Sequence, residues 1–124
     1  MKSLCTKWFN KWAQKAKLSK ESLLEAVDNL EKGLSAADLG SNLYKVRVQR
    51  SGKGKSAGFR TIIVYRSNDK AIFLYGFGKN EKSNIDKTEL KYFKKLGNDL
   101  LALNTEQIAD SLKKQTLFDI EVSS

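Results

Sequence analysis

The chain has 124 residues, enough for one domain with a buried core, and its 23 Lys and Arg against 14 Asp and Glu give a formal charge of +9. With no histidine and only one cysteine, Cys5, the composition excludes a zinc site and an internal disulfide. No apolar run reaches transmembrane length, so we expect a single cytoplasmic domain over residues 1–124 without metal or other cofactor. The charge makes nucleic acid the first candidate partner, ahead of an anionic membrane surface or an acidic protein.

Apolar residues at helical spacing predict a first helix over residues 3–16. Leu4, Trp8 and Trp12 recur every four residues, with lysines at the same spacing on another face. We interpret the two tryptophans as contacts with the core rather than as a binding platform. A helix of this kind also binds anionic lipid, but its tryptophans are needed to cover a sheet.

A second helix follows, and then the period of the pattern changes. Ser19 is placed to cap this helix and Gly33 to end it. We expect residues 34–42 to be a linker. Residues 44–49 alternate between apolar and polar side chains, which predicts a half-buried strand with a basic outer face.

Two further strands complete a predicted meander. Residues 59–66 are rich in β-branched side chains, and residues 67–70 have the composition of a hairpin turn. Residues 71–77 are almost wholly apolar, which favours a central strand that is buried on both faces.

The C-terminal part predicts two more helices and a last strand. Asp86 is placed to cap the first of these helices, and Asn104 or Thr105 the second. Residues 117–122 are a possible edge strand. The predicted fold class is therefore α+β, with N-terminal helices packed on a small twisted antiparallel sheet, followed by C-terminal helices.

A glycine-rich basic loop, residues 50–60, joins the first two predicted strands. It reads Arg50-Ser-Gly-Lys-Gly-Lys-Ser-Ala-Gly-Phe-Arg60, and from residue 39 to residue 68 there are seven Lys or Arg and no acidic residue. Such a loop suits close approach of a polyanion. It is not a nucleotide-binding P-loop, because the spacing of the glycines differs and a strand follows it. The alternative is a solvated hairpin loop that is basic by chance.

The meander places the start of its second strand beside the end of its third. Lys53, Lys55, Arg60 and Lys79 would therefore surround one concavity. A lysine crowded by cations can act as a general base, and an arginine can bind a phosphate that gains charge in the transition state. Because RNA carries its own 2′-OH nucleophile, such a cluster can cleave it without metal or histidine. The alternative is that Lys79 and Lys82 are ordinary surface residues before a helix.

Four motifs in this order resemble the RelE superfamily of type II toxin–antitoxin toxins. They are Asp38-Leu-Gly40, Leu43-Tyr-Lys-Val-Arg-Val48, Gly52-Lys-Gly-Lys-Ser-Ala-Gly-Phe-Arg60 and Phe77-Gly-Lys-Asn-Glu-Lys82. The HigB-type branch is the most similar. The resemblance implies a RelE-like fold and a ribosome-dependent endoribonuclease that cuts mRNA in the A site of the 30S subunit. It also implies a cognate antitoxin, often a helix-turn-helix protein.

The resemblance also implies roles for single residues. Arg60 takes the place of the arginine that stabilises the phosphate, and Lys53, Lys55 and Lys79 are the other candidate catalytic cations. Ala57 and Gly78 depart from the family pattern, and no Tyr or His near the C-terminus matches the acid of some members, so the proton donor is unassigned. The remaining cations of the predicted strands and loops are candidate RNA ligands: Lys45, Arg47, Arg50, Arg66 and Lys82.

A nonenzymatic RNA- or ribosome-binding module is the rival interpretation. A nuclease should lose its function sharply at Arg60 or at one lysine. A binding module should lose affinity gradually, and by similar amounts at each cation of the basic face.

Overall fold

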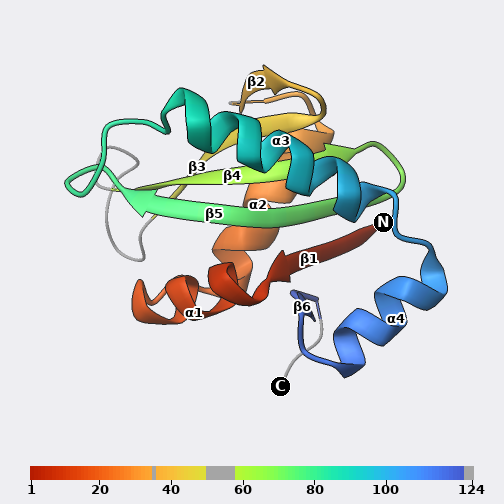
Figure 1. Ribbon diagram of the computed structural model, residues 1–124. Helices are drawn as coiled ribbons and strands as arrows, with labels where there is room; N and C mark the ends of the chain where they lie inside the picture. Colours follow the sequence, from red (N-terminus) through yellow and green to blue (C-terminus); the bar gives the residue numbers. More distant parts are fainter. Residues whose placement is uncertain (35, 50–57, 122–124) are drawn as a thin grey trace.

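A computed structural model of the chain describes residues 1–34, 36–49 and 58–121. Within these residues the chain forms a sheet with the strand order β2-β3-β4-β5-β1-β6, in which only the β1–β5 pair is parallel (Figure 1). The fold class is α+β, as predicted. The elements in chain order are β1 (Lys2–Thr6), α1 (Lys7–Lys15), α2 (Lys20–Glu31), β2 (Ala36–Gly40), β3 (Leu43–Val48), β4 (Phe59–Arg66), β5 (Lys70–Gly78), α3 (Lys87–Leu101), α4 (Thr105–Lys113) and β6 (Leu117–Asp119).

The sheet separates two hydrophobic clusters. Because side chains alternate along a strand, Ile63 of β4 points to one face, and Ile62 and Val64 point to the other. Helices α1 and α2 cover the first face, whereas α3 and α4 cover the second; in Figure 1, α2 and α3 run on opposite sides of the sheet. None of the helices among the described residues is long and apolar enough to cross a membrane.

The predicted starts of α2, α3 and α4 are confirmed by their capping bonds. The Ser19 hydroxyl accepts from the backbone N–H of Ser22 at 3.1 Å. Asp86 and Asn104 begin α3 and α4, and each forms a capping box with the third residue of its helix. Each cap satisfies backbone donors that the first turn of a helix leaves free.

The predicted meander is confirmed as β3, β4 and β5. The bounds of β4 are those expected from its β-branched residues. Strand β5 lies between β4 and β1, and all but one of its residues are buried, which accounts for its apolar composition.

Two N-terminal predictions are wrong, because each region contains a strand that its local sequence pattern does not indicate. Residues 2–6 form β1, which pairs with β5 and β6, so the first helix begins only after Thr6. The linker expected over residues 34–42 contains β2. Its hairpin to β3 turns at Ser41 and Asn42, both with positive φ as a two-residue turn of this kind requires. The expected last strand is confirmed for residues 117–119, and Val122 lies outside the described residues.

The Cys5 thiol is expected to be unreactive in the folded protein. It is buried in β1, and burial raises its pKa to about 12. Since the thiolate is the reactive form, iodoacetamide at pH 8 should label Cys5 only after urea is added, as measured by mass spectrometry. Unfolding should also become easier as the pH rises from 9.0 toward about 12, because only the unfolded thiol ionises there. Rapid labelling without urea would contradict the buried position of β1.

Candidate nucleic-acid interface

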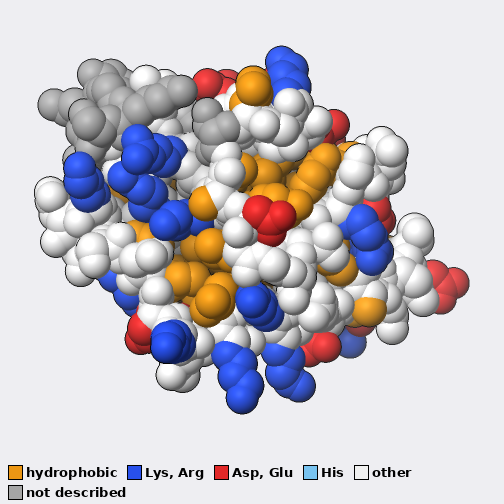
Figure 2. Space-filling view, turned by 90° about the horizontal axis from the view of Figure 1, so that it is seen from above, with side chains coloured by type: hydrophobic (Ala, Val, Ile, Leu, Met, Phe, Trp, Pro, Cys, Tyr) orange, Lys and Arg blue, Asp and Glu red, His pale blue; other side chains and the backbone are white. Residues whose placement is uncertain are grey.

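The register of two strands gathers three cations on one face of the sheet. Arg47 of β3 lies directly opposite Arg60 of β4, and Lys45 lies opposite Ile62. Since cross-strand partners share a face, Lys45, Arg47 and Arg60 point to the side on which Ile62 packs against α3. We call these three residues the basic face. Figure 2, which views the molecule from above as it stands in Figure 1, shows blue side chains gathered on this side of the molecule.

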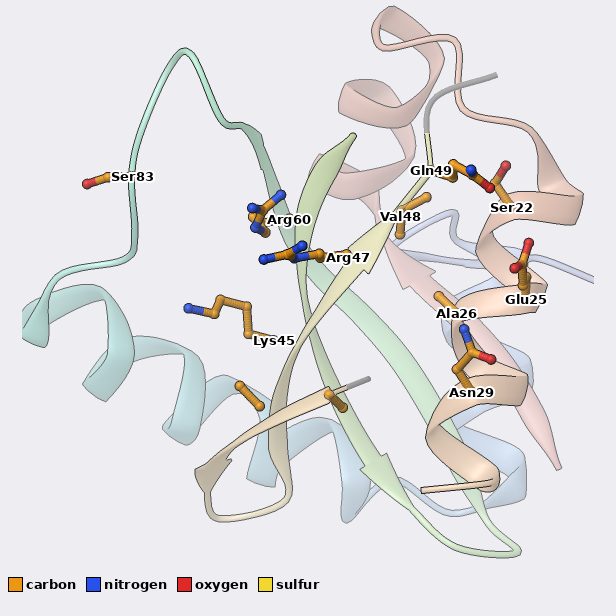
Figure 3. A pocket seen from close by; sticks show the side chains of 12 residues that line it. Ser22, Glu25, Ala26, Asn29, Lys45, Arg47, Val48, Gln49, Arg60 and Ser83 are labelled. Atoms are coloured by element: carbon orange, nitrogen blue, oxygen red, sulfur yellow. The ribbon is translucent and has the colours of Figure 1, made fainter. Parts of the chain in front are cut away.

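A cavity of about 600 Å³ lies along the basic face and around the edge of β3. Strand β2 pairs with β3 only up to Val46, so the described part of β2 leaves Arg47 and Val48 at an open edge. Figure 3 shows the nitrogen atoms of Arg47 and Arg60 close to each other, with Lys45 and Ser83 on the same side of β3. The cavity can therefore admit a strand of anionic polymer that contacts both arginines.

Arg60 carries a buried donor that has no acceptor. Its Nη1 atom is buried, and among the described residues nothing accepts a hydrogen bond from it. Burial lowers the pKa of the Arg60 guanidinium, and the nearby charge of Arg47 lowers it further. A guanidinium remains protonated despite such shifts. An oxyanion at this point would accept the unused hydrogen bond and offset the repulsion between the two arginines.

The loop before α3 supplies polar groups that sequence analysis missed. The Nζ of Lys45 donates to the Oδ1 of Asn84 at 3.4 Å, and Ser83 lines the cavity. Neither residue belongs to a motif with catalytic spacing. The one local signal, Asp86 as the cap of α3, fixes where the helix begins but not which way the preceding loop runs.

Of the four predicted site residues in the two neighbouring loops, the structure describes only Lys79. Lys79 is exposed and directly follows Gly78, which pairs with Phe59, so it lies at the same end of the sheet as Arg60, as predicted. Arg50, Lys53 and Lys55 lie outside the described residues.

Neither Lys82 nor Arg66 lines this cavity. The Lys82 ammonium pairs with Glu89, which raises its pKa, and stands 5.5 Å from the centre of the Tyr75 ring. Arg66, at the far end of β4, donates to Asp69 and to the carbonyl oxygen of Leu101 at the end of α3. Both side chains therefore already have acceptors within the protein.

Comparison with known families gives a match over nearly the whole chain. The sequence model of a family described as "RelE toxin of RelE / RelB toxin-antitoxin system" matches residues 1–120. No curated protein matches the chain. The matched range contains each of the strands and helices described above.

Proposed function

The chain belongs to the RelE toxin family, and we propose that it is an endoribonuclease that cuts mRNA in the ribosomal A site and thereby inhibits translation. Toxins of this family generally cleave mRNA, and the family implies an antitoxin partner. The observation that carries the proposal is the buried Nη1 atom of Arg60, which has no acceptor among the described residues, with Arg47 opposite it. The motif from Gly52 to Ser56 and the later run from Lys79 to Glu81 support placement in the HigB-type branch.

The proposed reaction uses the 2′-OH of RNA as its nucleophile. A base removes the 2′-OH proton, and the oxygen attacks the adjacent phosphorus. The bond to the 5′-oxygen then breaks, leaving a 2′,3′-cyclic phosphate and a 5′-hydroxyl that has taken up a proton. Arg60 stabilises the charge that develops on the phosphate oxygens. Lys53 or Lys55 is proposed as the base, with Lys79 as a further cation; no metal is involved, and the proton donor is unassigned.

Lys45 and Arg47 are proposed to hold the phosphates next to the scissile one, because both line the cavity beside Arg60. Arg50 is proposed to extend this contact along the glycine-rich loop. The proposal leaves Arg66 and Lys82 outside this contact, because each already pairs with a carboxylate and neither lines the cavity.

Mapping of mRNA 5′ ends tests the proposal. The chain would be induced in a bacterial host, and the purified protein would be added to mRNA with and without ribosomes. We expect growth arrest, new 5′ ends within translated frames, and cleavage that requires the ribosome. Growth arrest without new 5′ ends would instead favour the nonenzymatic module that binds RNA or the ribosome. Cleavage of free mRNA at the same rate as in the presence of ribosomes would overturn the proposed role of the A site.

A further inference from the structure

The loop between β5 and α3, residues 79–86, carries two groups of the candidate site. Lys79 begins the loop and is a proposed catalytic cation, and Ser83 lines the cavity beside Arg60. In Figure 1 the loop extends beyond the end of β5 before it returns to α3, and in Figure 3 Ser83 lies on the same side of β3 as Lys45 and Arg60. Because residues 79–86 contain no helix or strand, contacts of side chains must hold these two groups in place.

One ion pair connects the loop to α3. The Nζ of Lys82 donates to the Oε2 of Glu89, while the Oε1 of the same carboxylate accepts from the backbone N–H of Asp86 at 3.0 Å. The side chains of Lys82 and Glu89 are only 29% and 26% exposed, so solvent and salt screen this pair less than they screen a pair on the open surface. Glu89 therefore holds the loop at two points, Lys82 and Asp86.

Two further contacts hold the same part of the loop. The Nζ of Lys82 lies 5.5 Å from the centre of the Tyr75 ring, a distance at which a cation is attracted to an aromatic face. Tyr75 belongs to β5 and packs against a ring of α3, so it is a firm support. On the other side, the Oδ1 of Asn84 accepts from the Nζ of Lys45 at 3.4 Å. Ser83 is thus placed between an attachment to α3 and an attachment to the basic face.

We propose that Lys82 and Glu89 are positioning residues for cleavage, because their ion pair holds the loop so that Lys79 and Ser83 face the RNA beside Arg60. This inference rests on the proposed function, since it assumes that RNA is cleaved at Arg60. Lys82, a candidate RNA ligand by sequence, contributes to cleavage without touching the substrate. A displacement of reacting groups by about 1 Å is enough to slow an enzymatic step by about 100-fold, so a contact outside the cavity can control the rate.

Glu89→Gln and Lys82→Gln test the ion pair. Glutamine in place of Glu89 removes the charge but keeps the capping box, which accepts either Glu or Gln at this position. We expect each variant to cleave ribosome-bound mRNA about 10- to 100-fold more slowly under single-turnover conditions. The affinity for ribosomes that carry an uncleavable 2′-O-methylated mRNA should stay within about threefold of wild type, because neither side chain touches RNA. Asp110→Asn is the matched control: it breaks an exposed ion pair on α4 and should cleave at the wild-type rate.

The double variant and the direction of the binding change separate this role from direct contact with RNA. The double variant should lose no more than either single variant, because both substitutions remove the same interaction. If Lys82 bound RNA itself, Lys82→Gln would weaken RNA binding, whereas Glu89→Gln would release the lysine and strengthen it. That result would overturn the proposal, as would additive losses in the double variant or wild-type cleavage by both single variants.

Hydrogen exchange in the free protein gives a readout that does not depend on cleavage. The backbone amides of Glu81 and Lys82 donate to the carbonyl oxygen of Gly78 at 3.1 and 3.2 Å. We expect these amides to exchange at least about threefold faster in both variants than in the wild type, measured by mass spectrometry. Unchanged exchange over residues 79–86 would overturn the proposal. Faster exchange in a protein that cuts no mRNA would leave the ion pair as the contact that holds the loop, and would refute only the proposed function.

Discussion

Arg60→Ala is expected to abolish mRNA cleavage. The substitution removes the guanidinium whose buried Nη1 has no acceptor among the described residues, and with it the donor proposed to bind the phosphate. Loss of one preorganised donor to a developing oxyanion lowers a rate by about 10²- to 10³-fold. The measurement is the rate of cleavage of ribosome-bound mRNA under single-turnover conditions. The cleavage rate of Arg60→Lys should lie between those of the wild type and Arg60→Ala, because lysine keeps the charge but lacks the planar fork.

The same substitution should leave the stability unchanged or raise it. Since burial and the charge of Arg47 lower the pKa of Arg60, the protonated guanidinium is less favourable in the folded protein than in the unfolded chain. That cost is present at every pH at which arginine is protonated, and alanine removes it. We therefore expect the midpoint of urea denaturation to stay the same or to rise.

Arg47→Ala and Lys45→Ala are the matched controls for Arg60. Both residues line the cavity, but neither is proposed to act on the scissile phosphate. They should weaken RNA binding with a much smaller loss of the cleavage rate. Equal losses at all three positions would favour the binding module over the nuclease, and unfolding of Arg60→Ala would overturn its assignment.

The central strands were predictable because their composition and their environment agree. Strand β5 is buried by β4, β1 and helices on both faces, and only an apolar run satisfies that position. Strands β1 and β2 were not predictable, because their local sequences do not indicate the strands that they form. β1 is five residues long and is stabilised by parallel pairing with β5, about 68 residues away along the chain, while Leu4 happens to continue the spacing of Trp8 and Trp12. β2 reads Ala-Ala-Asp-Leu-Gly, a sequence of low strand propensity.

The candidate site was predictable only as far as strand register allowed. Alternation in β3 sufficed to predict a basic outer face with Lys45 and Arg47, and the observed register of β3 and β4 adds Arg60 to that face. The same alternation put Arg66 on that face too, but six residues along a strand separate it from Arg60, and Asp69 binds it there. The pairing of Lys82 with Glu89 depends on how the loop before α3 turns, which no local pattern specifies.

The role of a glycine in β5 also depends on a tertiary contact that the local sequence does not reveal. By composition, Gly76 and Gly78 indicate a loosening of the chain at the end of the strand. Both instead lie within β5 and pair with β4. A Cβ built on Gly76 would stand 2.2 Å from the Trp12 ring, so the absence of a side chain lets α1 approach the sheet. The reason for this glycine is a tertiary contact with a residue 64 positions earlier in the sequence.

Gly76→Ala is therefore expected to be the most destabilising single-methyl change in β5. The methyl group would overlap the Trp12 indole, which is held between Trp8, Phe9 and Phe59 and cannot move without shifting α1. Overpacking of this kind costs about 3 kcal/mol, the upper part of its usual range. The measurement is the midpoint of urea denaturation at unchanged m-value.

Gly78→Ala is the matched control, two residues further along the same strand. A Cβ there would meet the Oε1 of Glu81 at 2.9 Å, which is the end of an exposed, flexible side chain that can turn away. We expect Gly78→Ala to change stability by less than about 1 kcal/mol, since alanine loses less backbone entropy than glycine on folding. Equal costs at the two positions would mean that Trp12 does not rest on Gly76, and that α1 is not held against β5 by this contact.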